Sequence, residues 1–210
     1  MIEVHHLNNS RSQRILWLLE ELDLPYEIVA YSRDPATRLA PATLKAIHPL
    51  GKSPVIRDDG LVIAESGAIV EYLAGKYGKG RLSPAVDFNS PEYVAYLHWL
   101  HFAEGSAMVP LLLKLYVGRL KEAAAPLTPR IESELKNHFD YMEAALGSND
   151  YFVANRFSAA DIQLSFVLDA GAVRGPLKDY PNLTRLHGRL KARPAYQRAL
   201  ERGGPYELAR

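Results

Sequence analysis

Cysteine is absent from this chain of 210 residues, which excludes disulfides, thiolate metal sites and a protein thiol as nucleophile. An excess of one charge is also missing, because 25 basic and 24 acidic residues give a formal net charge of +1. That balance argues against a nucleic-acid partner, which would require clustered basic residues. The best apolar run, from Val109 to Val117, is interrupted by Lys114 and too short to cross a membrane. No signal peptide is visible, so we expect a cytoplasmic protein without a membrane partner.

Hydrophobic residues make up 48% of the chain, enough for a sizeable core. The first third alternates short strands and helices, read from apolar periods of two and of about 3.6 residues. A strand, a crossover helix and a second strand imply a parallel pair, and the turn at Asp58-Asp59-Gly60 adds an antiparallel hairpin. The expected order is β-α-β-α-β-β-α, over residues 2–6, 10–24, 26–31, 41–48, 55–57, 61–64 and 66–77.

A stretch rich in Gly, Pro, Ser and Asp, residues 78–91, is typical of a linker. Beyond it every pattern has the helical period. We therefore predict an α/β domain over residues 1–78, a linker over 79–90 and an all-helical domain over 91–210. The helices are expected at 91–122, with a bend near Pro110, and at 127–146, 158–173, 183–191 and 196–201.

The helix that begins at Ser158 has a clear start signal. Ser158 and Asp161 have the spacing of a capping box, and Phe157 and Ile162 that of a hydrophobic staple. We interpret Asp161 as structural, with no part in catalysis.

Three polar segments of the first domain should meet at one end of its sheet: Asn8 to Arg11, His48 to Pro54, and Glu65-Ser66. Two of them lead into helices, and helix starts favour anions. Arg11 and Lys52 add positive charge. Such a place suits a ligand with carboxylates and an acidic thiol.

These motifs resemble those of the soluble glutathione transferases, whose fold is a thioredoxin-like domain followed by an all-helical domain. Leu50-Gly51-Lys52-Ser53-Pro54 resembles the loop before their cis-proline. The segment from Ala64 to Ile69 resembles their motif for the γ-glutamyl end of glutathione, and that from Phe157 to Asp161 resembles their helix-capping motif. Ser53 is a departure, since valine is commoner at that position.

The resemblance implies that glutathione is the co-substrate and that the protein is a homodimer. No metal is expected, because cysteine is absent and the histidines lack the spacing of a ligand set. Ser53, before the cis-proline Pro54, would pair with the cysteinyl unit through its backbone. Glu65 and Ser66 would bind the γ-glutamyl end, and Lys52, with His48, the glycyl carboxylate. Glu104 would reach glutathione across the dimer interface. The pocket for an apolar electrophile would be lined by Trp99, Phe102, Met108 and Leu112.

The family places a tyrosine, serine or cysteine at the start of the first helix to act on the thiol. Tyr26 lies beyond that helix, so Ser10 is the expected catalytic residue, assisted by Arg11, with Ser12 and Asn9 as alternatives. Lowering the thiol pKa of about 8.5 by two units takes roughly 2.7 kcal/mol. A hydroxyl donor and a helix start can supply that together, so Ser10 would donate to the thiolate. The thiolate could be conjugated to electrophiles or reduce hydroperoxides.

Several plainer interpretations remain open at this point. Ser10 could be only a helix cap. The protein could carry glutathione or apolar ligands with little turnover, or be an interaction module that has lost glutathione. His5 and His6 lie on a strand without metal-ligand spacing and are interpreted as incidental.

Overall fold

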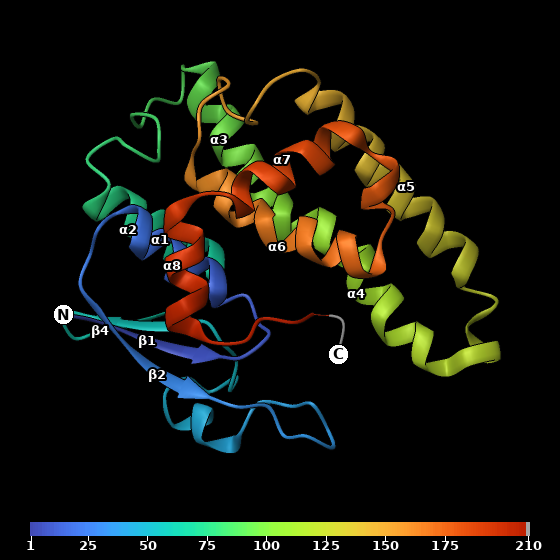
Figure 1. The fold of residues 1–210 in the computed structure, drawn as a ribbon, viewed down its shortest axis with the longest axis horizontal. Helices are drawn as coiled ribbons and strands as arrows, with labels where there is room; N and C mark the ends of the chain where they lie inside the picture. Colours follow the sequence, from blue (N-terminus) through green and yellow to red (C-terminus); the bar gives the residue numbers. More distant parts are fainter. Residues whose placement is uncertain (209–210) are drawn as a thin grey trace. The chain divides into compact units, whose positions relative to one another are not determined.

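The computed structural model describes residues 1–208, which form two compact units (Figure 1). The first contains residues 1–83 together with 191–208, and the second contains residues 84–190. This division differs from the expected one at its end, because the last helix packs with the first unit and not with the helical domain.

The first unit is built on a four-stranded sheet in the order β2-β1-β3-β4. The strands are β1 (Ile2–Leu7), β2 (Tyr26–Tyr31), β3 (Val55–Asp58) and β4 (Leu61–Ala64). β1 and β2 are parallel, while β3 is antiparallel to both β1 and β4. The predicted parallel pair and hairpin are therefore confirmed.

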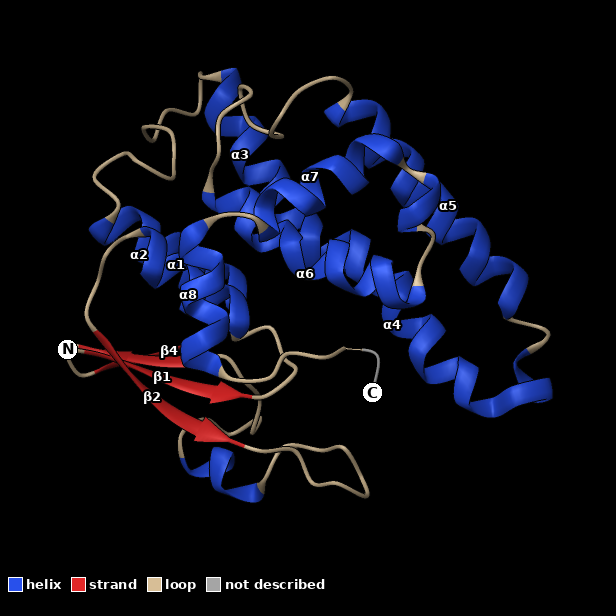
Figure 2. Ribbon diagram, in the orientation of Figure 1, coloured by secondary structure: helices blue, strands red, loops and turns tan. Residues whose placement is uncertain are grey.

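Helices cover both faces of this sheet (Figure 2). α1 (Gln13–Glu21), α2 (Ser66–Tyr77) and α8 (Pro194–Gly203) lie on one face, and the short 3₁₀ helix η1 (Ala42–Ala46) lies on the other. α1 buries Ile15, Leu16 and Leu19 completely, and α2 does the same with Ile69 and Leu73. Each such side chain contributes about 1.5–3 kcal/mol, so the face between helices and sheet is the core of this unit.

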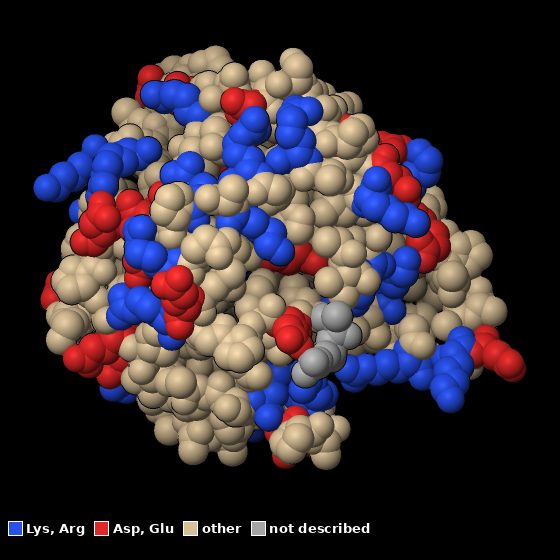
Figure 3. Space-filling view, in the orientation of Figure 1, with Lys and Arg blue, Asp and Glu red and all other residues tan. Residues whose placement is uncertain are grey.

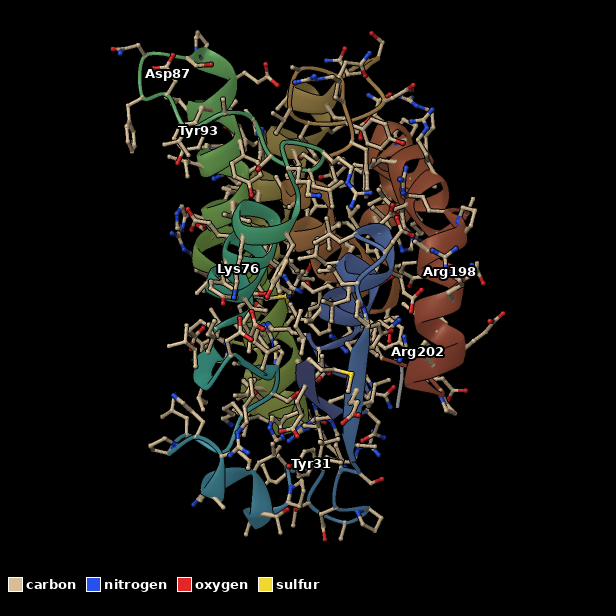
Figure 4. All side chains as sticks on the ribbon, turned by 90° about the vertical axis from the view of Figure 1, so that its left-hand side faces the viewer. Tyr31, Lys76, Asp87, Tyr93, Arg198 and Arg202 are labelled. Atoms are coloured by element: carbon tan, nitrogen blue, oxygen red, sulfur yellow. The ribbon has the colours of Figure 1, made fainter. Side chains whose placement is uncertain are left out.

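α8 is fastened to α1 by two carboxylates. The Arg193 guanidinium makes a two-pronged contact with Glu21, at 2.6 and 2.9 Å. Glu20 accepts from Arg198 at 2.9 Å and from Arg202 at 3.0 Å, and both arginines extend from α8 toward α1 (Figure 4). Bidentate, charge-assisted bonds hold orientation as well as distance. The last helix is thus a fixed part of the first unit.

The second unit is all-helical, with α6 (Ala159–Arg174) at its centre. Every residue of α6 from Ala159 to Gly171 is buried, the mark of a helix surrounded by others. The helices around it are α3 (Pro91–Phe102), α4 (Met108–Val117), α5 (Thr128–Leu146) and α7 (Pro181–Lys191), with 3₁₀ turns η3 (Gly118–Ala124) and η4 (Leu177–Asp179).

The long helix expected over residues 91–122 is interrupted. A π-helical turn, η2 (Ala103–Ala107), separates α3 from α4, and α4 ends in the 3₁₀ turn η3. Pro110 explains the first break, because it lacks an amide hydrogen and its ring crowds the carbonyl of Ser106 one turn earlier. Lys121, with φ of 52°, accounts for the irregularity of η3.

The capping box at the start of α6 is confirmed. Ser158 accepts from the Asp161 amide, and the Asp161 carboxylate accepts from the Ser158 amide at 2.8 Å. The carboxylate also accepts from the Ser158 hydroxyl at 3.0 Å and the Phe152 amide at 3.3 Å. Asp161 is completely buried, and that burial raises its pKa to about 6. It holds the preceding loop on the helix start.

Candidate functional site

Three polar segments leave the sheet of the first unit at the same edge. Val55, at the beginning of β3, pairs with His5 near the end of β1 and with Ala64 at the end of β4. The loop after β1, the loop before β3 and the segment after β4 therefore start side by side. The predicted convergence of Asn8–Arg11, His48–Pro54 and Glu65-Ser66 follows from this register.

The Ser53 side chain hydrogen-bonds to the backbone of β1 just beyond Val55, where the pairing between β1 and β3 ends. Its hydroxyl donates to the His5 carbonyl at 2.7 Å and accepts from the Leu7 amide at 3.1 Å. The Ser53–Pro54 bond is cis, as the resemblance implied. The hydroxyl satisfies two backbone groups of β1 that would otherwise lack partners in the sheet. A valine could not do this, which is a physical reason for the serine.

Glu65 precedes α2 in an unusual conformation. Its φ is 69° and its ψ 117°, a region that residues with a Cβ seldom adopt. The Glu65 side chain is exposed, while Ser66, the first residue of α2, is buried. Strained backbone of this kind clusters at ligand sites, where it directs groups that a relaxed turn would not.

Ser10 lies in the turn that leads into α1, whose N-cap is Ser12. Its hydroxyl accepts from the Ser12 amide at 3.2 Å and is 2.7 Å from the Ser12 hydroxyl. Ser10 is 5% exposed and Ser12 is fully buried. The two hydroxyls therefore form a pair whose inner member is sealed from solvent.

His6 extends this pair inward. Its Nδ1 is 2.8 Å from the Ser12 hydroxyl and its Nε2 is 3.1 Å from the carbonyl oxygen of Gly203, at the end of α8. The imidazole is 4% exposed, and burial lowers its pKa below the ordinary value. The sequence pattern does not predict these two contacts. The alternation of β1 places His6 on the helix-covered face, but nothing in the local pattern reveals Gly203 as a partner.

The segment after α8 also reaches the loop that carries Ser10. The Glu207 amide donates to Asn9 Oδ1 at 2.6 Å, and Arg33 donates to the Asn9 carbonyl at 3.1 Å. Asn9 itself has φ of 52°, which asparagine tolerates better than most residues. These contacts fix the amide of Asn9 with its oxygen toward Glu207.

The predicted carboxylate ligands lie on the loop between η1 and β3. Lys52 is exposed and His48 half-buried, while Arg11 is half-buried beside Ser10. Gly51, with φ of 57°, turns the chain between His48 and Lys52. This part of the edge therefore presents the Lys52 ammonium to solvent.

Comparison with known proteins places these features in a family. The glutathione S-transferase N-terminal domain matches residues 1–75, and a C-terminal domain of the same family matches residues 114–202. Glutathione S-transferase 3 of Schizosaccharomyces pombe is 38% identical, over 96% of this chain and 88% of the relative. Glutathione S-transferase 1 of Saccharomyces cerevisiae is 32% identical, over 96% and 95% respectively. This chain belongs to the glutathione S-transferase family.

Solved structures agree with the assignment. A glutathione S-transferase from Actinobacillus pleuropneumoniae has a TM-score of 0.91 and 36% identity, covering all of this chain and 96% of that one. Another, from Methylobacterium radiotolerans, was solved in complex with glutathione sulfonate. It has a TM-score of 0.77 and 25% identity, with 98% and 95% coverage. The first unit thus contains the thioredoxin-like domain of a glutathione S-transferase, and the second its helical part.

The remaining predicted residues of this transferase lie in the helical unit. Trp99 and Met108 are buried in its core, where Trp99 stacks on Tyr141 with ring centroids 5.4 Å apart. Phe102 and Leu112 are half-buried and keep part of their surface accessible. Glu104 is half-buried on the π-helical turn. Trp99 and Met108 thus belong to the core of the helical unit, and the pocket role expected for all four residues stays a prediction.

Two observations concern other kinds of site. Among residues 1–208, no three His, Asp or Glu side chains are arranged to hold a metal ion. Within the same residues, no helix combines the length and hydrophobicity that crossing a membrane requires. Acidic and basic side chains are interspersed on the face drawn in Figure 3, in keeping with the balanced net charge.

Proposed function

We propose that this glutathione transferase binds glutathione at the sheet edge formed by Ser10, the Ser53–Pro54 bond and Glu65-Ser66, and that it directs the thiolate at electrophiles. The observation that supports this most is the junction at Val55, which brings all three motifs to one edge in a member of the family. The backbone of Ser53 would pair with the cysteinyl unit, Glu65 and Ser66 would bind the γ-glutamyl end, and Lys52 with His48 would meet the glycyl carboxylate.

Ser10 is proposed as the residue that contacts the sulfur. A hydroxyl that donates to a thiolate contributes about 1.5–3 kcal/mol, enough to lower the thiol pKa by one to two units. Arg11, next along the turn, adds positive charge. Asn9 is the alternative donor, because its oxygen is turned toward Glu207 and its amino group away from it.

The test of Ser10 is turnover of a chlorinated nitroaromatic by Ser10→Ala. We expect kcat to fall at least tenfold, with glutathione affinity little changed. Asn9→Ala, made in the same loop, serves as the comparison. Full activity in Ser10→Ala together with a large loss in Asn9→Ala would transfer the role to Asn9.

Glu65 is tested by binding. We expect Glu65→Gln, which keeps the side-chain length but removes the charge, to weaken glutathione binding by about 1–3 kcal/mol, the value of a charge-assisted contact. Isothermal titration calorimetry measures this directly. An unchanged dissociation constant would place the γ-glutamyl end elsewhere.

A homodimer is proposed as the working assembly. Leu61 and Val62, on the edge strand β4, are 55% and 46% exposed, and an uncovered apolar edge strand is a natural pairing surface. Glu104 would then reach glutathione on the partner. Analytical ultracentrifugation of the wild type and of Val62→Lys tests this: we expect a dimer that Val62→Lys weakens, whereas a monomeric wild type would refute it.

Conjugation and hydroperoxide reduction use the same thiolate, and both are proposed activities. Phe102 and Leu112 would contact the apolar electrophile. The cytoplasmic location expected from the sequence stays a prediction.

A further inference from the structure

The hydrogen-bond chain from Ser10 to Gly203 has a direction that its chemistry fixes. The Gly203 carbonyl can only accept, so His6 Nε2 carries a hydrogen. A neutral imidazole then has an unprotonated Nδ1, which must accept from the Ser12 hydroxyl 2.8 Å away. The Leu7 carbonyl, 3.2 Å from the same hydroxyl, is the poorer acceptor, and donation to it would set two lone pairs against each other at Nδ1.

The same reasoning orients Ser10. Because the only hydrogen of the Ser12 hydroxyl goes to His6, Ser12 Oγ accepts at its 2.7 Å contact with Ser10, and the Ser10 hydroxyl is the donor. Ser10 Oγ also accepts from the Ser12 amide. One lone pair of Ser10 is left for a ligand. Before any proton moves, Ser10 can therefore accept from a thiol but cannot donate to a thiolate.

We propose that His6 takes the proton of the glutathione thiol through the hydroxyls of Ser10 and Ser12. This inference rests on the proposed binding of glutathione at Ser10. The thiol proton passes to Ser10 Oγ, the Ser10 proton to Ser12 Oγ and the Ser12 proton to His6 Nδ1, so each oxygen gains one proton and loses one. The products are a thiolate and an imidazolium.

The transfer reverses every hydrogen bond of the chain. Ser10 now donates to the thiolate, Ser12 donates to Ser10, and His6 donates to Ser12 through Nδ1 while Nε2 still donates to Gly203. The donor role of Ser10 is thus a result of the transfer. After the thiolate has reacted, the proton on His6 returns along the same hydroxyls to solvent or to a basic leaving group.

The surroundings of His6 suit a base that charges only when the ligand is present. Burial lowers its pKa, and the bond to Gly203 opposes this in part. The elements around it carry charged residues of both signs: Arg14, Glu20 and Glu21 on α1, Arg33 after β2, Arg198, Glu201 and Arg202 on α8, and Glu207 after α8. Arg202 is engaged with Glu20, and Arg33 with backbone carbonyls. The thiolate would be the counter-ion that the ligand brings.

A set of variants separates proton transfer from structural support. His6→Asn can still accept from Ser12 through its amide oxygen but cannot take up a proton. Ser12→Ala interrupts the chain at its middle. His5→Asn is the matched control, because His5 is equally buried on the same strand but contacts Tyr31 and Glu3 on the opposite face.

The decisive readout is the pKa of the bound thiol, followed by the ultraviolet absorbance of the thiolate as a function of pH. We expect His6→Asn and Ser12→Ala to raise this pKa by at least one unit, His5→Asn to leave it unchanged, and the double variant His6→Asn/Ser12→Ala to match the single ones. Turnover below the thiol pKa should fall about tenfold or more and recover at high pH. A wild-type thiol pKa in His6→Asn would overturn the proposal.

Nitrogen NMR of the wild type reports the tautomer and protonation state of His6 directly, so it tests the proposal even if a variant fails to fold. We expect His6 to be a neutral Nε2–H tautomer in the free protein and with S-methylglutathione, which has no thiol proton, and an imidazolium with glutathione. A neutral His6 beside an ionised thiol would refute the transfer. Calorimetry keeps the two hypotheses apart, since glutathione that binds normally without protonating His6 contradicts only the relay, and absence of binding contradicts the proposed function.

Discussion

Asp161→Asn tests whether the buried carboxyl at the start of α6 is protonated more readily in the folded protein than in the unfolded chain. Asp161 is fully buried, and its two oxygens accept from the Ser158 amide, the Ser158 hydroxyl and the Phe152 amide. An asparagine keeps the shape but has one oxygen, so at least one buried donor loses its acceptor. Each such loss costs about 1–3 kcal/mol, and we expect the variant to be less stable by that amount or more at acidic pH.

The penalty should depend on pH in a defined direction. Burial raises the pKa of Asp161 to about 6 in the folded protein, from an ordinary value of 3.8. The folded state therefore binds this proton more tightly than the unfolded state. As the pH rises from 3.8 through 6, the contribution of this carboxyl to the free energy of unfolding of the protein falls. Asparagine does not titrate, so it makes no pH-dependent contribution to the free energy of unfolding. Between about pH 4.5 and about pH 7.5 the difference in free energy of unfolding between the wild type and Asp161→Asn should shrink by about 2 kcal/mol.

Urea denaturation of both proteins at the two pH values measures this. All other titrating groups are common to both and cancel in the difference, and reversible two-state transitions with equal slopes are the condition for using it. A destabilisation that is constant, or that grows toward neutral pH, would contradict a raised pKa of Asp161 in the folded protein. It would mean that the hydrogen bonds of the capping box outweigh the cost of burying the charge.

Two further predictions concern packing. We expect Gly171→Ala to lower the free energy of unfolding by about 1–3 kcal/mol in urea denaturation, because its Cβ would lie 2.6 Å from the buried ring of Phe139. The control is Gly188→Ala, whose Cβ would meet nothing within 4 Å. It should raise the free energy of unfolding by about 0.5–1 kcal/mol, because alanine favours a helix over glycine. Arg193→Ala should destabilise the first unit by about 3 kcal/mol because Glu21, only 9% exposed, loses its cation, and faster amide exchange in α8 would show the loosened helix.

Much of the fold could be predicted because local pattern and tertiary structure agree. The strand Tyr26–Tyr31 and the helix Ser66–Tyr77 have their predicted bounds, since apolar spacing and flanking turns determine both. A bend was predicted near Pro110, and the structure has a π-helical turn just before it, at Ala103–Ala107. A proline disturbs the turn that precedes it, where its ring meets a carbonyl, and the sequence pattern marks only the proline itself.

The site was predictable where it depends on sheet topology and unpredictable where it depends on distant contacts. Ser53 and Glu65 could be assigned to one edge because β3 lies between β1 and β4. His6 was interpreted as incidental, although its side chain hydrogen-bonds to the carbonyl of Gly203, 197 residues away. Neither the period of β1 nor that of α8 encodes this pairing, which depends on how the last helix packs on α1.

The discontinuity of the first unit has a consequence for biosynthesis. Residues 1–83 emerge from the ribosome long before residues 191–208, yet α1 needs α8 to cover Trp17 and to neutralise Glu20 and Glu21. The first unit therefore cannot be completed until residues 84–190 have been translated, and until then α1 lacks the helix that covers one of its faces. Translation of α8 is thus the step at which the imidazole of His6 acquires its Gly203 partner, 197 residues after His6 itself was made.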